Sequence, residues 1–242
     1  MEDFQVVGNH WKGMVVSMEL DISHVNRREI YRYLGYRGQI PDETVCYMIE
    51  EVLKELLRVV KPRNLYQSYE CKVQNSEIRL WNEAQEGTIV FKSKKLADNL
   101  VQCEKVILLA ATLGIEADKL LQRYEIMNMA KASVTQACGA ACMEAYCNLV
   151  QEQIREQQLT DGFYLRPRFS PGYGDLALET QKVIFDCLQC SKRLGLTLTD
   201  SLLMYPTKSV TAFIGITKNK QGCHIARCSS CENTGCEFRY ED

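Results

Sequence analysis

Residues 166–175, RPRFSPGYGD, bring together side chains that bind small charged molecules. The guanidinium of Arg168 is always charged and can hold a carboxylate through two parallel hydrogen bonds. The ring of Tyr173 offers an aromatic face to an organic cation, a contact that contributes about 2 kcal/mol when it is desolvated. Two prolines stiffen the segment, and glycines such as Gly172 let a ligand approach the backbone. The pattern predicts a rigid loop that can bind a carboxylate and a cation together.

Two interpretations of this loop follow from its chemistry. S-adenosylmethionine combines a carboxylate, a sulfonium cation and an adenine ring, so it matches the groups that the loop offers. A rigid turn with a surface salt bridge needs the same residues, and on chemistry alone this simpler interpretation is favoured.

A cysteine cluster in the last 20 residues is a second candidate site. The segment is too polar for these thiols to belong to a core. One C-x-x-C pair in a compact set fits an iron–sulfur cluster somewhat better than zinc, whose two knuckles are usually about 15 or more residues apart. Zinc and free thiols remain the alternatives. The candidate metal ligands, separated by four, two and four residues, are Cys223, Cys228, Cys231 and Cys236.

Length, composition and charge limit the class of protein. The chain has 242 residues, 46% of them apolar, which suits one large domain or two small ones. A net charge of −2 argues against nucleic acid or lipid headgroups as partners held by bulk charge. The sequence shows no secretory signal and no apolar run near the roughly 18 residues of a membrane span. With twelve cysteines, these features predict a protein of the reducing cytoplasm.

The elements that must position these residues alternate irregularly along the chain. Short neighbouring strands suggest local hairpins, so we expect an α+β fold: a single domain with a mixed, largely antiparallel twisted sheet flanked by helices. Hydrophobic periodicity and turn residues predict helices at 23–35, 41–60, 93–103, 115–157 and 176–195. Strands are predicted at 13–20, 68–74, 77–81, 88–93, 105–114 and 208–216.

The middle of the predicted 115–157 helical region is rich in Ala, Gly, Ser and Cys. Such a surface lets another backbone or a ligand come very close. Its cysteines, Cys138, Cys142 and Cys147, are expected to be small buried packing residues. The tyrosines at 31, 33 and 36 alternate with arginines, and we interpret them as the half-buried edge of a solvated helix rather than as a stacking face for nucleic acid.

Several motifs in order along the chain carry a resemblance to a known family. Arg168 to Tyr173 fits the pattern R-x-x-x-G-Y, residues 143–146 read MEAY, and residues 196–215 pass through an M-Y-P turn into a strand. This order resembles the activation domain of cobalamin-dependent methionine synthase, in a free-standing form, over nearly the whole chain to about residue 218. The resemblance implies a domain at 1–218 and a cysteine-rich tail at 219–242.

The same resemblance implies a ligand and the residues that hold it. The family's domain binds S-adenosylmethionine in a shallow groove and presents the methyl group to cobalamin. By position, Arg168 would hold the methionine carboxylate, and Gly172 and Tyr173 would form the groove. Glu144 would be the acidic partner of the amino group, and Asp21 a further acidic ligand.

The resemblance also implies a function that needs other proteins. This sequence has no cobalamin-binding motif, so it would support reductive methylation of cob(II)alamin on a separate corrinoid protein. The partner would be a methionine synthase lacking its own activation domain, or another corrinoid methyltransferase, with a flavodoxin or ferredoxin-like electron donor. The alternatives are a non-enzymatic binding module, and a redox module that uses the cysteine tail for docking or electron transfer.

Overall fold

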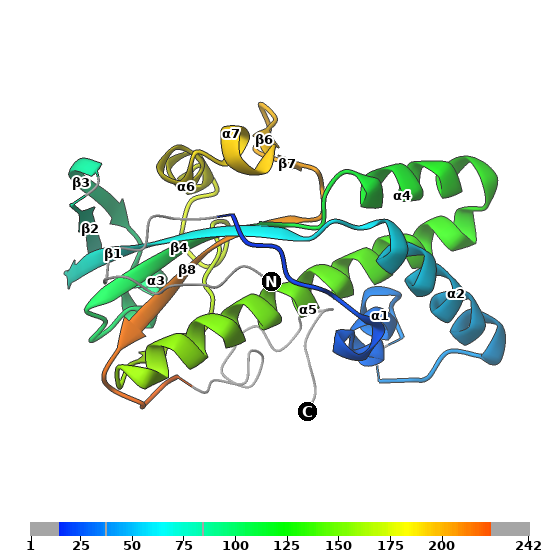
Figure 1. The fold of residues 1–242 in the computed structure, drawn as a ribbon, viewed down its shortest axis with the longest axis horizontal. Coiled ribbons are helices and arrows are strands. Elements are labelled where there is room, and N and C mark those ends of the chain that lie inside the picture. Colours follow the sequence, from blue (N-terminus) through cyan, green and yellow to red (C-terminus); the bar gives the residue numbers. More distant parts are fainter. Residues whose placement is uncertain (1–14, 37, 84, 224–242) are drawn as a thin grey trace, which may run out of the picture.

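A six-stranded antiparallel sheet forms the centre of the molecule (Figure 1). The structure is a computed structural model that describes residues 15–36, 38–83 and 85–223. The strand order is β3-β2-β1-β4-β8-β5, and every pairing recorded in these ranges is antiparallel. The strands are β1 (Arg63–Gln74), β2 (Glu77–Asn82), β3 (Gln85–Lys92), β4 (Lys105–Thr112), β5 (Tyr164–Leu165) and β8 (Ser209–Thr217). The expected α+β class with a largely antiparallel sheet is confirmed.

Local sequence explains two features of the sheet, the β1–β2 hairpin and the central position of β4. Asn75 and Ser76 both have positive φ, 48° and 66°, which is the conformation of a tight two-residue hairpin turn between β1 and β2. Strand β4 lies between β1 and β8 and is buried on both faces, in agreement with its continuous apolar run. The middle of the sheet therefore separates two hydrophobic cores.

Helices cover both faces of the sheet (Figure 1). One core lies under α1 (Arg27–Tyr33), α2 (Glu43–Val59), α4 (Glu116–Met127) and α5 (Met129–Thr160). The other lies under α3 (Lys94–Asn99), α6 (Thr180–Leu188) and α7 (Cys190–Leu194). Beside α7, the short strands β6 (Thr197–Leu198) and β7 (Met204–Tyr205) pair with each other. None of the helices in the described ranges has the length and apolar character of a membrane span.

Helix α5 has 32 residues and runs below the sheet in Figure 1, past its edge to the side where α2 and α4 pack. Its cysteines Cys138, Cys142 and Cys147 are buried in the core, as predicted. Gly139 leaves room for a lysine, because a Cβ atom there would lie 2.7 Å from Cε of Lys208. The small residues of α5 thus allow close packing inside this protein.

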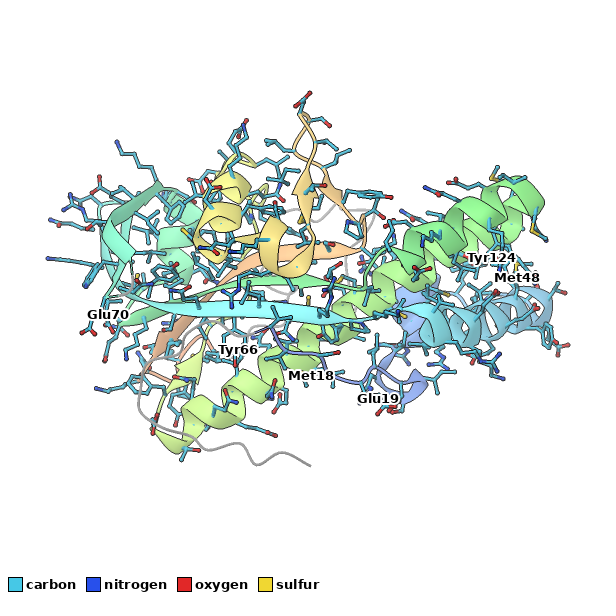
Figure 2. The ribbon with its side chains drawn as sticks, turned by 45° about the horizontal axis from the view of Figure 1, so that its top comes forward. Met18, Glu19, Met48, Tyr66, Glu70 and Tyr124 are labelled. Carbon is cyan, nitrogen blue, oxygen red and sulfur yellow. The ribbon has the colours of Figure 1, made fainter. Side chains whose placement is uncertain are left out.

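Two side chains on one face of β1 show how far along this strand helix α5 covers the sheet (Figure 2). Tyr66 is buried and its hydroxyl lies 3.4 Å from Oε1 of Gln157 on α5. Glu70, four residues further along the same face, is exposed and pairs with Lys105 of β4. At the opposite side of the molecule, Tyr124 of α4 lies beside α2 and hydrogen-bonds Glu55.

Several predicted elements differ from the structure. The helix predicted at 23–35 begins only at Arg27, because Asn26 is extended and caps α1 at the amide of Arg28. The strand predicted at 13–20 is wrong for the described residues 15–20, because only Val16 pairs there, in an isolated bridge with Asn64 of β1. The 115–157 region is two helices, because Asn128 is extended at φ −161° and its side chain caps α5 at the amide of Lys131. The 176–195 helix is divided at Gln189, whose φ of 52° ends α6.

Candidate ligand-binding site

Strand β8 fixes the backbone that carries Arg168. After β5, the amide of Arg166 donates to the carbonyl of Gly215 at 2.8 Å. Phe169 and Phe213 then exchange two backbone hydrogen bonds of 2.9 and 2.8 Å. Residues 164–169 therefore follow the edge of the sheet, and their position is set by β8.

The guanidinium of Arg168 reaches from this edge to one side of helix α5. Its Nη2 lies 3.0 Å from Oε2 of Glu144 and 2.9 Å from Oδ1 of Asn148. Its Nη1 lies 2.7 Å from Oε1 of Gln151. Positions 144, 148 and 151 are one and two turns apart, so they present their oxygens along one line. The structure thus brings together the predicted Arg168 and Glu144, which are 24 residues apart in the chain.

The Arg168–Glu144 ion pair is sheltered on one side only. The Arg168 side chain is 9% exposed, whereas that of Glu144 is 35% exposed. An arginine that is nearly buried must keep its charge compensated, and here a carboxylate and two amide oxygens do so. A molecule arriving from solvent would reach Glu144 first.

Two glycines after Arg168, Gly172 and Gly174, have positive φ and lie where the loop turns toward helix α3. Gly172 has φ +87°, a left-handed conformation that favours glycine, and its amide donates to the carbonyl of Leu176 at 2.9 Å. Tyr173 is 69% exposed at the turn. The structure therefore places Gly172 and Tyr173 on the same loop as Arg168, with the tyrosine ring accessible to solvent.

Asp175 attaches the far end of this loop to helix α3. Its carboxylate accepts hydrogen bonds from the hydroxyl of Ser93 at 2.5 Å and from the amides of Lys94 and Lys95 at 2.6 and 3.1 Å. The hydrogen bond from Ser93, followed by those from the α3 amides, lowers the pKa of Asp175. A negative charge at the first turn of a helix is favourable, so this contact fastens the loop to α3.

We expect Asp175→Ala to lower the melting temperature by about 2–4 °C, because α3 loses an acceptor for its first amides. The folded pKa of Asp175 lies below its unfolded value, so the contact stabilises the fold above about pH 4 and is lost as the pH falls through the lowered pKa. Melting curves between about pH 3 and 7 would measure both effects. Asp98→Asn, on the exposed side of α3, is the matched control. Equal melting curves for Asp175→Ala and the wild type would contradict the contact.

Asp21 has a local role in the structure. Its carboxylate caps the short 3-10 helix η1 (Ile22–His24), where it accepts from the amide of Ser23 at 2.7 Å and from its hydroxyl at 2.6 Å. These hydrogen bonds, the hydroxyl first, lower the pKa of Asp21. Its expected contact with a ligand stays a prediction.

The cysteine tail lies mostly outside the described residues. Cys223 is within them and is partly buried, whereas Cys228, Cys231 and Cys236 are not. The described part of the chain contains no group of three or more side chains arranged to hold a metal ion. Arg166 holds the start of the tail, since its Nη1 donates to the carbonyl of Gln221 at 2.5 Å. The predicted cluster or zinc site, and the division near residue 218, stay predictions.

A shallow depression of about 520 Å³ lies over α6 and α7. Lys182, Phe185 and Lys192 are among its lining residues, and Arg168 is not. Because α5 and α6 cover opposite faces of the sheet, this depression is separate from the Arg168–Glu144 pair (Figure 1). It has no charged group that is both buried and directed into it, so we do not assign it the binding chemistry described above.

Comparisons with known proteins agree with this architecture. Residues 94–232 match the family described as "Vitamin B12 dependent methionine synthase, activation domain". Among solved structures, a crystal structure of the MetH reactivation domain bound to AdoHcy aligns with a TM-score of 0.66 and 18% identity. The alignment covers 86% of this chain and 79% of that chain. No curated protein matches the sequence. The family match spans more than half of the chain, and the chain therefore belongs to the activation-domain family of vitamin B12-dependent methionine synthase.

Proposed function

We propose that this protein binds S-adenosylmethionine at Arg168 and Glu144 and offers its methyl group to cobalamin on a separate corrinoid protein. The observation that carries the proposal is the ion pair between Arg168 and Glu144 at 3.0 Å. Membership of the activation-domain family supports it. The ligand in the similar MetH structure, AdoHcy, is what remains of S-adenosylmethionine after methyl transfer.

The ion pair suits the amino-acid end of this ligand. A free amino acid carries one carboxylate and one ammonium group, so it can replace an internal pair of opposite charges without leaving either charge uncompensated. The ligand carboxylate would take two hydrogen bonds from Arg168, and the ammonium would face Glu144. Because Glu144 is the more exposed of the two side chains, the exchange can begin from the solvent side.

The adenosyl end would then lie toward the loop that follows Arg168. Tyr173 is exposed there and offers an aromatic face to the sulfonium or the adenine. Gly172 has no side chain, so a ligand can approach the backbone at the turn. This arrangement would leave the methyl group facing away from the sheet, toward a docked partner.

The proposed reaction requires two components that this chain does not supply. One electron from a donor, such as a flavodoxin or a ferredoxin-like protein, reduces cob(II)alamin, and the methyl group then passes from the sulfonium to the cobalt. The products are the methylated corrinoid and S-adenosylhomocysteine. The corrinoid protein would be a methionine synthase without its own activation domain or another corrinoid methyltransferase. This chain would contribute binding and orientation, and no general base is needed.

Calorimetry with three ligands tests the binding step. We expect S-adenosylmethionine and S-adenosylhomocysteine to bind the full chain, and 5′-methylthioadenosine to bind about a hundredfold more weakly. The third ligand keeps the adenosyl and sulfur groups but lacks the amino acid, so it loses about 3 kcal/mol of charge-assisted hydrogen bonds. Equal affinity for all three would show that Arg168 and Glu144 do not hold the amino-acid end. Absence of heat with every ligand would remove the proposed function.

A further inference from the structure

Two neutral side chains of α5 share the guanidinium of Arg168 with Glu144. Its Nη1 donates to Oε1 of Gln151 at 2.7 Å. Its Nη2 is divided between Oδ1 of Asn148 at 2.9 Å and the carboxylate of Glu144 at 3.0 Å. A carboxamide oxygen accepts a hydrogen bond but carries no net charge. Of these three side chains, the two amides therefore direct the guanidinium, and Glu144 also balances its charge.

The contact between Gln151 and Arg168 joins two parts of the backbone that are firmly held. Gln151 follows Val150, which is fully buried in the core against which α5 packs. Arg168 precedes Phe169, which is hydrogen-bonded to β8. Gln151 is half-buried, whereas Asn148 is exposed, so the bond from Nη1 is the more sheltered of the two amide contacts. Gln151 is therefore the amide better placed to set the direction of the guanidinium.

The proposed ligand would exchange only the charged partner of Arg168. A guanidinium has five N–H donors, so it can keep its bonds to both amides and still present two parallel N–H groups to a carboxylate. The ligand ammonium would then pair with Glu144, and each charge would keep a partner of opposite sign. A carboxylate at position 151 would change this balance, because it would compensate the guanidinium from inside the protein and repel the carboxylate of the ligand.

We propose that Gln151 is a positioning residue that holds Arg168 in place through an uncharged contact and so makes the site selective for ligands with a carboxylate. This inference rests on the proposed function. Gln151 acts through Arg168 and does not need to touch the ligand. Loss of its oxygen would loosen the guanidinium, and a negative charge in its place would remove the preference for a carboxylate.

Two ligands that differ by one carboxylate, S-adenosylmethionine and decarboxylated S-adenosylmethionine, test the inference by calorimetry. Gln151→Glu keeps an acceptor oxygen but adds a negative charge, so we expect it to weaken the binding of S-adenosylmethionine roughly tenfold or more. The decarboxylated ligand keeps its ammonium and sulfonium groups, so this variant should bind it as tightly as the wild type does, or more tightly. Gln122→Glu, at an exposed position of α4, adds the same charge and is the matched control, which should bind both ligands like the wild type.

A second variant separates the direction of Arg168 from its charge. Gln151→Met removes the acceptor and leaves the net charge unchanged. We expect it to weaken the binding of S-adenosylmethionine roughly fivefold and to change that of the decarboxylated ligand less than about twofold, because only a carboxylate depends on the direction of the guanidinium. In an Arg168→Ala background the same substitution should have almost no further effect on either ligand, since Gln151 acts through Arg168.

The possible results separate the inference from the proposed function. Equal weakening of both ligands by the Gln151 variants would show that Gln151 only supports the fold, and would overturn the positioning role. If the wild type binds S-adenosylmethionine and both Gln151 variants bind it equally well, the inference fails alone. If the wild type itself binds neither ligand, the proposed function fails and the inference fails with it.

Discussion

Replacing Arg168 by alanine is expected to weaken the binding of S-adenosylhomocysteine by at least about a hundredfold. Two charge-assisted hydrogen bonds to the ligand carboxylate would be lost, at about 1.5–3 kcal/mol each. The substitution also leaves Glu144 without the guanidinium that lies 3.0 Å away in the structure. Titration calorimetry of the wild type and the variant, at one salt concentration, gives the ratio of dissociation constants.

Two further variants test whether the loss of affinity comes from the guanidinium of Arg168 itself and not from the loss of any positive charge. Arg168→Lys keeps the charge but not the two-pronged geometry, so we expect an affinity between those of the wild type and the alanine variant. Arg155→Ala removes an arginine that pairs with Glu152 on the surface of α5, the helix that carries Glu144, and this variant should bind like the wild type. If Arg168→Ala kept its melting curve and bound the ligand within about threefold of the wild type, Arg168 would not be the carboxylate ligand.

Replacing Phe213 by alanine is expected to cost about 3–5 kcal/mol in the free energy of unfolding. Phe213 is fully buried in the core under α6, and its ring meets that of Phe91 edge-on with 5.1 Å between the ring centres. Removal of the ring leaves a cavity that a packed sheet cannot close completely. In a chain of this length the melting temperature should fall by roughly 10 °C.

The Phe213 variant should also affect the Arg168 loop. The backbone of Phe213 holds Phe169, the neighbour of Arg168, so a loosened β8 would be expected to weaken ligand binding too. Val210→Ala, a half-buried position on the same strand, is the control and should lose much less stability. Denaturant unfolding measures the difference, and a loss below about 1 kcal/mol for Phe213→Ala would contradict the tight packing of this core.

Helix α2 and the hairpin strands are predicted correctly because a local sequence pattern determines each of them. The amphipathic pattern after Asp42 predicted α2, and the structure shows Asp42 capping it at the amide of Val45. The hairpin strands were predicted because polar turns interrupt runs of alternating residues. The break at Asn128 was missed because its neighbours on both sides favour helix, although an asparagine that can cap a helix was the available signal.

Contacts between distant parts of the chain were only partly predictable. The pairing of Arg168 with Glu144 follows a family resemblance, and no rule of spacing relates residues 24 positions apart on a loop and a helix. Asn148 and Gln151 were missed, although their spacing from Glu144 along one side of a helix was a usable signal. Asp175 was missed as an anchor, because its partners on α3 lie about 80 residues earlier in the chain.

The Arg168 loop is attached to β8 through Phe169 and to α3 through Asp175, and these two attachments would affect how the proposed ligand is captured. A segment fastened at both ends has little conformational freedom left to lose, so most of the ordering cost of binding has been met during folding. The proposed ligand would therefore meet a site whose shape is already set. Diffusion and orientation, rather than closure of a lid, would then limit the rate of encounter.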